Sequence, residues 1–370
     1  MISDDSEVGA LAVLAGLPSM SRRRLALVLG RHGAVEALEC LRAGAPLHPT
    51  VAPRRDVAER LRVQCAGVSV ARRVEGCRRS GVEVTVPGDV DYPSALLDDP
   101  ERPAVLFVRG DVSLWSARRV GVVGTRNSTA AGRATAAHLG GSLARAGVSV
   151  VSGLARGIDT AAHRGVVSSG CPGAVAVLGN GPDLAYPRAN RDLLDHLVEG
   201  HLVLSEWPPG TRPDGFRFPL RNRIIAALSE VLVVVESRAS GGSLITARAA
   251  LDRGVQVMAV PGSPRCAASE GANHLLRDGA APVTSVDDVL EVLSITAQPA
   301  APRGPGPLSD PLALALVEAC RDGPRSLDQL VALSGAGVAP VAAAVAELLR
   351  EGWLADEAGW LEVAVSGLPP

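Results

Sequence analysis

The fold is decided by residues 119–165, which read RVGVVGTRNSTAAGRATAAHLGGSLARAGVSVVSGLARGIDTAAHRG. An apolar run over 119–124 ends in a glycine-containing loop, and a helical segment over 129–146 follows it. A second apolar run, 148–152, ends in the same way before a helical segment over 158–169. Buried parallel strands have this continuous apolar character, and their connection is usually a helix. The stretch therefore predicts two strand–helix units of one parallel sheet.

The same alternation continues along the chain. Four further apolar runs predict strands, at 173–178, 202–205, 231–235 and 255–260. Helical segments follow them, at 189–199, 220–228, 243–252 and 271–277. This spacing predicts an α/β fold with a doubly wound parallel sheet. Such sheets bind ligands beyond the carboxyl ends of their strands.

The flanking segments predict two smaller domains. Helical spacing over 8–80 indicates an N-terminal helical domain, 1–85, of the SAM or helix-hairpin-helix type, serving either as a contact domain or as a grip on DNA. The sheet domain then spans 86–295, and 296–310 is a Pro- and Gly-rich linker. Residues 311–370 predict three helices and a two-stranded wing, which is the outline of a winged helix, with either protein or DNA as its partner.

The composition excludes several functions. All 37 basic residues of the 370 are arginine, so a Walker A loop, a protein kinase and a Schiff-base enzyme each lack their lysine. The net charge of −2 combines +5 over 31–80 with −5 over 311–370. The acidic charge of residues 311–370 disfavours binding of that domain to a phosphate backbone. Only 2% of the residues are aromatic, yet Tyr186, Trp207, Phe216 and Phe218 lie within one short stretch.

Targeting and metal signals are missing from the sequence. No apolar run reaches the ~18–20 residues that span a bilayer, and the acidic N-terminus lacks the basic region of a secretory signal. The six cysteines show no paired spacing, and the seven histidines show no HExxH pattern. We therefore expect a cytoplasmic protein with reduced thiols, no membrane contact, no metal and no cofactor.

Five predicted strand-end loops carry donors for anions. The first contains Gly124, Thr125 and Arg126, and its lack of a GxGxxG pattern disfavours a dinucleotide. The second contains Ser152, Gly153, Arg156 and Gly157. The others supply Arg188 and Asn190, then Arg217 to Arg223, then Ser240, Gly242 and Ser243. Glycines let a backbone approach a phosphate closely, helix starts present free N–H groups, and guanidinium groups bind phosphate in a bidentate way.

Arginines interleaved with aromatic residues suit a single-stranded nucleic acid, whose bases stack on the rings. The alternative is that Phe216 and Phe218 are core residues under a loop. Asp159 and His163, four residues apart on a helix, form either a catalytic dyad or a satisfied helix pair, and we favour the pair. The loops thus indicate a binding groove, and we expect no enzymatic activity.

Several motifs in order resemble the DprA/Smf family of bacterial DNA-processing proteins. They are DYP at 91–93 with PAVLFVRG at 103–110, VGTR at 123–126, SGLARGIDTAAH at 152–163, YPRAN at 186–190, FPLRNRIIAALS at 218–229, GGSLITA at 241–247, PGS at 261–263 and GAN at 271–273. The resemblance implies an extended Rossmann fold that forms a homodimer, binds single-stranded DNA and loads the RecA recombinase onto it during natural transformation and recombination.

The resemblance also assigns residues to the DNA site. It implies that Arg126 holds a phosphate, that Ser152, Gly153, Arg156 and Gly157 line the same pocket, and that further residues complete it. These are Gly124, Thr125, Arg188, Asn190, Arg217, Phe218, Arg221, Asn222, Arg223, Ser240, Gly242 and Ser243. The chain departs from the family pattern at Arg188, where lysine is frequent, and at Ala227, where glycine is usual.

Two other functions remain as alternatives. One is a nucleotide N-glycosidase of the lonely-guy type, whose PGGxGTxxE motif supplies a glutamate; here the run Ser240 to Thr246 is followed by no such carboxylate. The other is a regulator that reads duplex DNA with its winged helix, which the acidic charge of 311–370 disfavours.

Overall fold

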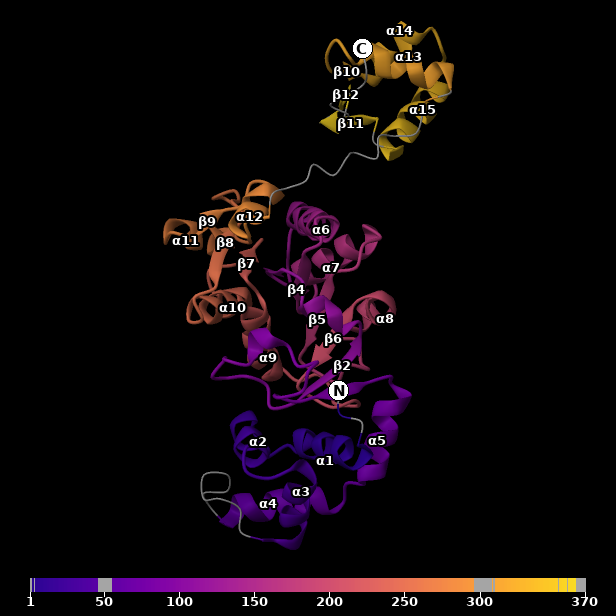
Figure 1. Ribbon diagram of the computed structural model, residues 1–370. Helices are drawn as coiled ribbons and strands as arrows, with labels where there is room; N and C mark the ends of the chain where they lie inside the picture. The colour runs from indigo at the N-terminus through magenta and orange to yellow at the C-terminus, as the bar shows by residue number, and fades with distance from the viewer. Residues whose placement is uncertain are drawn as a thin grey trace. The chain divides into compact units, whose positions relative to one another are not determined.

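The computed structural model describes residues 2, 4–45, 55–295, 308, 310–351, 353–357 and 359–363 of the chain. Its contacts form two compact units, Met1–Thr296 and Ala297–Pro370. Most of the predicted linker, 296–310, lies outside the described residues. The first unit contains the sheet and the N-terminal helices (Figure 1).

A nine-stranded sheet runs through the first unit. Its strands are β1 (Glu83–Thr85), β2 (Leu106–Gly110), β3 (Arg119–Val123), β4 (Ser149–Ser152), β5 (Ala174–Leu178), β6 (Leu202–Ser205), β7 (Val231–Val234), β8 (Gln256–Ala259) and β9 (Ala281–Pro282). Their order is β1-β2-β6-β5-β4-β3-β7-β8-β9. All six predicted strands are present and parallel, whereas β1 and β2 form an unpredicted antiparallel edge.

Helices cover both faces of this sheet, as the doubly wound fold requires. The helices that follow the strands are α6 (Ala130–Arg145), α7 (Ile158–Ser168), α8 (Arg191–Gly200), α9 (Arg217–Leu228), α10 (Gly242–Leu251), α11 (Glu270–Arg277) and α12 (Val286–Val292). Leu139, Ile158 and Leu194 belong to the core that α6, α7, α8 and α12 form on one face. Ile224 and Ala250 belong to the core on the other face, under α9, α10 and α11. The predicted Rossmann-like α/β class is confirmed.

The strand order places a switch point beside β3. From β3 the chain continues outward through β4, β5 and β6, and then returns to place β7 on the other side of β3. Loops that leave β3 and its neighbours at their carboxyl ends therefore diverge around a crevice, which is where open α/β sheets bind ligands.

Helices α6 and α7 pack unusually closely because glycines lie where they cross. A Cβ atom on Gly140 would lie 2.2 Å from the carbonyl oxygen of Ala162, and one on Gly165 would lie 1.9 Å from that of Ala137. Neither site has room for a side chain. The two helices that begin at the first two strand-end loops are thus held backbone to backbone.

The N-terminal helices pack on the antiparallel edge. They are α1 (Asp5–Gly16), α2 (Arg22–Leu29), α3 (Ala34–Ala43), α4 (Arg55–Ala66) and α5 (Val70–Arg79). Leu11 and Leu38 share one core with Val84 of β1 and Phe107 of β2, so the helices cover one face of these two strands. The domain boundary at residue 85 stays a prediction, since β1 pairs with β2 across it.

The second unit contains three helices and a small sheet. The elements are α13 (Pro311–Ala319), β10 (Arg325–Ser326), α14 (Leu327–Ser334), α15 (Val338–Glu351), β11 (Leu354–Glu357) and β12 (Trp360–Val363), with strand order β10-β12-β11. Leu316, Leu330, Val341 and Trp353 form its core. The helices and the β11–β12 hairpin lie where the sequence predicts them, and the winged-helix assignment itself stays a prediction.

The described helices were also compared with the thickness of a membrane. No single one of them is long and apolar enough to cross a bilayer; only the bent pair Leu327–Ser334 and Val338–Leu349 meets the length and composition requirement.

The close packing of α6 and α7 predicts a sharp difference between two helical glycines. Gly165→Ala forces backbone apart and should destabilise the first unit by about 1–3 kcal/mol. Gly76→Ala, in the middle of α5 with no atom near its Cβ position, should stabilise it by roughly 0.5–1 kcal/mol. Urea unfolding of both variants and the wild type measures this. A neutral Gly165→Ala would contradict the packing described here.

Candidate nucleic-acid interface

A pocket of about 210 Å³ lies over the carboxyl ends of β3, β4 and β5. Its lining comes from four segments that are far apart in sequence: Arg126, Gly153, Ala155, Arg156, Gly179, Asn180, Tyr186, Pro187 and Phe218. Arg126 and Arg156 are exposed, and none of the nine lining residues is acidic. The pocket is therefore open to solvent and positively charged, which suits an anionic ligand.

Three side chains form a stack at the wall of this pocket. The Arg126 guanidinium lies 4.8 Å from the centre of the Phe218 ring. Tyr186 stacks on the same ring, with centroids 5.2 Å apart and planes inclined by 24°. Tyr186 is 41% exposed, so it presents an aromatic surface to solvent. Because Arg126 and Tyr186 both pack on Phe218, a guanidinium group that can bind phosphate lies close to an aromatic ring that can stack on a base.

The loop that carries Arg126 is held by a buried carboxylate. Thr129 caps α6 by accepting a hydrogen bond from the Gly132 N–H (2.9 Å). Its own N–H and hydroxyl donate to the carboxylate of Glu236, at 2.9 and 2.6 Å. The Thr125 N–H donates to the Glu236 carbonyl oxygen, at 2.7 Å. Glu236 follows β7, so it ties the two loops of the switch point together, a role that the sequence pattern did not predict.

A buried arginine forms the base of the pocket. Arg221 is 2% exposed, and its Nη1 donates to the carbonyl oxygens of Gly153, at 2.7 Å, and Val177. A Cβ atom on Gly153 would lie 2.3 Å from that nitrogen, so a side chain there would displace the guanidinium group. Burial lowers the pKa of Arg221 to about 10, and Asp159 opposes this shift. Arg221 stays charged at neutral pH and binds the ends of β4 and β5 together.

The second strand-end loop has its own internal supports. The Ser152 hydroxyl donates to the Val122 carbonyl oxygen (2.7 Å). Asn190 Nδ2 donates to the Leu154 carbonyl oxygen (3.0 Å) and to the Thr160 hydroxyl (2.7 Å). Gly157 has a φ of 82°, which favours glycine. These side chains shape the loop from below.

The structure brings together part of the set of predicted site residues. Of that set, Arg126, Gly153, Arg156 and Phe218 line the pocket, Ser152, Asn190 and Arg221 lie beneath it, and Gly124, Thr125 and Gly157 lie in the supporting turns. Arg188 is exposed next to the lining residue Pro187. The pocket is also lined by five residues outside the predicted set: Ala155, Gly179, Asn180, Tyr186 and Pro187. The cluster of aromatic residues and the loop over 179–190 were the features of the sequence that could have indicated them.

The remaining predicted residues lie outside this pocket. Arg217 stacks between Trp207 (5.8 Å) and Phe216 (5.1 Å). Arg223 forms a buried ion pair with Glu206, at 2.5 Å. Asn222, Ser240, Gly242 and Ser243 lie at the adjacent loop after β7, where the Asn222 amide is 3.5 Å from the Gly242 carbonyl oxygen and the Ser243 hydroxyl donates to Ser237 (2.8 Å). Phe216 is 58% exposed, so interpreting it as a core residue is wrong.

Asp159 and His163 lie in α7 behind the pocket, and both are buried. No hydrogen bond joins these two described side chains, so the interpretation as a satisfied helix pair is wrong. Burial raises the pKa of Asp159, while Arg221 and the backbone N–H groups of Ala155 and Gly153 oppose the shift. Burial, with His201 nearby, lowers the pKa of His163 to about 3. His163 is therefore neutral at physiological pH.

All six cysteines are free thiols. Within the described ranges, no group of three or more His, Cys, Asp or Glu side chains could hold a metal ion.

The fold and the pocket together define a Rossmann-like α/β protein whose arginine-bearing loops meet an aromatic stack at the switch point of the sheet. The chain belongs to the DNA recombination-mediator protein A family, whose model matches residues 83–294. It is 41% identical to DNA processing protein DprA of Bacillus subtilis over 217 residues, 58% of this chain and 73% of that protein. It is 35% identical to Protein Smf of Escherichia coli over 283 residues, 74% of this chain and 75% of that protein.

Solved structures agree with this family. DNA processing protein A of Streptococcus pneumoniae superposes with a TM-score of 0.65 at 32% identity, covering 79% of this chain and 98% of that one. DNA processing protein A of Helicobacter pylori, described as having a unique single-stranded DNA binding mode, superposes with a TM-score of 0.52 at 25% identity, covering 58% and 97%. The resemblance to the DprA/Smf family is thereby confirmed.

The neutral, buried His163 predicts how stability depends on pH. Its pKa is about 3 when folded and near 6.5 when unfolded, so between these values the unfolded chain binds one more proton. The contribution of His163 to stability is therefore complete above about pH 6.5 and falls below it, by about 1.4 kcal/mol per pH unit. His163→Leu should remove this slope, as measured by urea unfolding between about pH 5 and pH 7.

Asp159, His201 and Glu206, whose pKa values are also shifted by burial, are present in both proteins, so their titrations cancel when the two curves are subtracted. The cysteines do not titrate in this range. An unchanged slope in His163→Leu would show that His163 is already protonated in the folded state.

Proposed function

We propose that this protein binds single-stranded DNA across the carboxyl edge of its sheet. The observation that carries the proposal is the stack of Arg126, Phe218 and Tyr186 beside the exposed Arg156. The guanidinium groups bind successive phosphates, and the exposed face of Tyr186 takes an unpaired base. A duplex keeps its bases paired and stacked, so it offers nothing to this ring.

The buried predicted residues support the site from below. Arg221, Ser152 and Asn190 donate to backbone carbonyl groups, and they act as positioning residues that fix the loops carrying Arg126 and Arg156. Arg188 and Ser240 are exposed, Gly242 is exposed at the start of α10, and Asn222 is partly exposed in α9. These residues extend the path of the strand. Phosphate contacts of this kind determine affinity and register but carry no information on sequence.

The activity we propose is binding without catalysis. The lining residues of the pocket include neither a carboxylate nor a histidine, so no acid–base pair faces a bound strand. This argues against the nucleotide N-glycosidase of the lonely-guy type. We assign no metal and no cofactor to the site, and we place the protein in the cytoplasm, where incoming DNA is processed.

We further propose that the protein protects the incoming strand and loads the RecA recombinase onto it during transformation and recombination. This follows from the family to which the chain belongs. We also propose a homodimer, which is supported by two apolar side chains that are half exposed on α10, Ile245 (51%) and Leu251 (52%). Covering these side chains in a second copy would remove apolar area from water.

The direct test is a titration with a labelled oligothymidylate and with a duplex of the same length. We expect much tighter binding of the single strand, because the stacking surface accepts only unpaired bases. Equal or tighter binding of the duplex would contradict the proposal and favour the winged-helix regulator. The same titration with the recombinase present separates a loader, which speeds recombinase assembly on the bound strand, from a passive binder.

Arg126→Ala should weaken binding to every sequence by a similar factor, because a phosphate contact is shared by all of them. The slope of log affinity against log salt should become shallower by roughly 0.7, since the variant neutralises one phosphate fewer on a single strand. Arg277→Ala is the matched control, since Arg277 is exposed at the end of α11, on the amino edge of the sheet. A weakening restricted to one sequence would contradict a phosphate role.

A further inference from the structure

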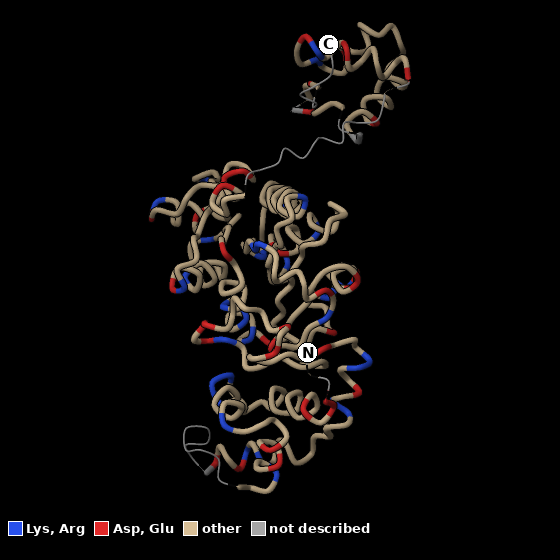
Figure 2. The backbone as a smooth tube through the Cα atoms, in the orientation of Figure 1, with Lys and Arg blue, Asp and Glu red and all other residues tan. Residues whose placement is uncertain are grey.

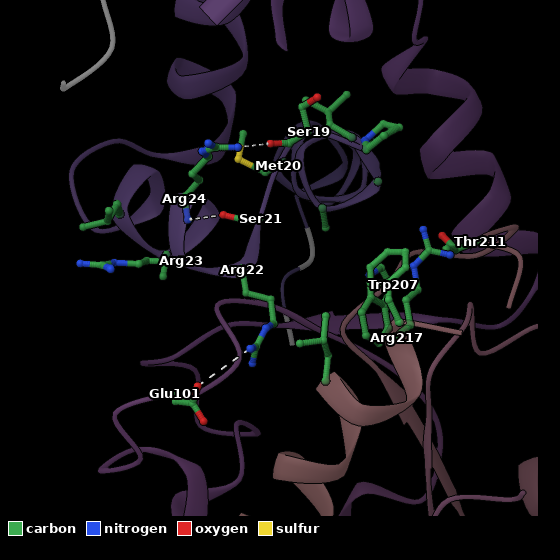
Figure 3. Close-up of a pocket in the computed structure, with 18 of the residues that line it drawn as sticks. Ser19, Met20, Ser21, Arg22, Arg23, Arg24, Glu101, Trp207, Thr211 and Arg217 are labelled. Carbon is green, nitrogen blue, oxygen red and sulfur yellow. Dashed lines mark hydrogen bonds and ion pairs between the residues drawn. The ribbon is translucent and has the colours of Figure 1, made fainter. Parts of the chain in front are cut away.

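A second, larger cavity lies between the N-terminal helices and the sheet. Its volume is about 750 Å³, and α2, the segment 100–102 and the segment 207–220 contribute its walls (Figure 3). Its lining includes one acidic residue, Glu101, and six arginines: Arg22, Arg23, Arg24, Arg60, Arg102 and Arg217. We refer to it as the arginine cleft. Blue segments on α2 mark part of this charge in Figure 2.

Most of the positive charge in the cleft remains uncompensated. Arg24 donates to the Ser19 carbonyl oxygen (2.8 Å), Arg102 to that of Leu97 (2.5 Å) and Arg217 to that of Arg212 (2.6 Å). These neutral partners position the guanidinium groups without cancelling their charge.

The acids near the cleft are already occupied. Glu101 is 3.9 Å from Arg22 and also forms an ion pair of 3.1 Å with Arg253, which is outside the cleft. Glu206, next to the lining residue Trp207, is paired with Arg223. Arg60 has its own exposed partner, Asp56, at 3.0 Å. The cleft therefore attracts an anion.

The first turn of α2 carries an unusual charge pattern. Ser21 caps the helix, and Arg22, Arg23 and Arg24 follow it directly, with no acidic residue in the turn. Cations at a helix N-terminus are unfavourable, because the helix dipole and the free N–H groups already make that end positive. In Figure 3 these three arginines extend in different directions around the opening, with Arg22 toward Glu101. Several phosphates spaced along a strand would offset this repulsion better than a single small anion.

The opposite wall of the cleft is aromatic. Trp207 and Phe216 flank Arg217, and Phe216 is 58% exposed. Figure 3 shows Trp207 and Arg217 together, on the other side of the pocket from α2. An exposed ring opposite guanidinium groups repeats the combination seen at the Tyr186–Phe218 stack, and it suits a base attached to a phosphate.

The two sites are adjacent along the chain. Phe216 and Arg217 line the arginine cleft, and Phe218 lines the first pocket. Consecutive Cα atoms are 3.8 Å apart, so Phe216 and Phe218 are separated by at most about 7.6 Å at their Cα atoms. A strand that stacks at Tyr186 and Phe218 can therefore pass Phe216 and enter the cleft.

We propose that the arginine cleft is a second binding site for the same DNA strand, in which α2 holds phosphates and Phe216 with Trp207 holds a base. The inference rests on the proposed function, because it extends the path of the strand that leaves the first pocket. It gives the N-terminal helices a direct role in DNA binding, one that lengthens the bound segment.

The test compares a short and a long oligothymidylate, of about four and about sixteen nucleotides, which bracket known single-strand site sizes. The variant is the full chain with Arg22→Gln and Arg23→Gln, which removes charge but keeps good helix formers. For the long strand, the slope of log affinity against log salt should become shallower by about 0.7 per phosphate released, so by about 1.4 for two. The short strand should bind the variant as it binds the wild type.

The control carries Arg145→Gln and Arg277→Gln, which remove the same charge from exposed helix ends at the amino edge of the sheet. If it matches the cleft variant, the effect is one of net charge and the proposal is overturned. A cleft that binds the mononucleotide dTMP as tightly as the long strand would also overturn it. If Arg126→Gln changes neither affinity, the proposed function itself fails, whatever the cleft variant does. Thermal unfolding of each variant confirms that it is folded.

Discussion

The buried guanidinium group of Arg221 is the interaction on which the candidate site depends. It binds the carbonyl groups at the ends of β4 and β5, and it lies three residues after Phe218 in α9. Residues three apart lie on the same side of a helix, so fixing Arg221 in the core also fixes the direction in which Phe218 leaves it. The position of the aromatic stack is thus set by a buried guanidinium group beneath the pocket. A buried charge without partners would be strongly destabilising, and the strand ends supply the partners that hold it.

Much of the fold could be predicted because the central strands are buried on both faces. Six continuous apolar runs became six parallel strands, and no boundary differs from its predicted position by more than one residue. The edge strands β1 and β9 were missed because they have only three and two residues. The strand β2 was also missed, although it lies in the apolar run over 104–108, because that run was used only as part of a motif. The start of α9 was placed three residues late, because Pro219 suggested a boundary; at the third position of a helix, proline loses no intrahelical hydrogen bond.

The site was predictable in its location but less so in the orientation of each side chain. Glycines and arginines after apolar runs identified the carboxyl edge of the sheet, where Arg126 and Arg156 are indeed exposed. Nothing in the spacing of Arg221 and Arg223 distinguishes them from such surface residues. Their burial depends on carbonyl groups and on Glu206, contributed by strands distant in sequence. Glu236 was missed for the same reason, since its partners in the first loop lie more than a hundred residues earlier.

The backbone contact between α6 and α7 also has a geometric consequence. Arg126 lies in the loop before α6 and Arg156 in the loop before α7. Because the backbones of these helices are in direct contact at Gly140 and Gly165, the two helices and the loops before them form one rigid unit. The distance between the loops that carry the two guanidinium groups is then fixed by this helix packing. In the proposed function, a bound strand would have to match the fixed distance between Arg126 and Arg156. That distance is determined by the crossing of α6 and α7, which lies away from the pocket.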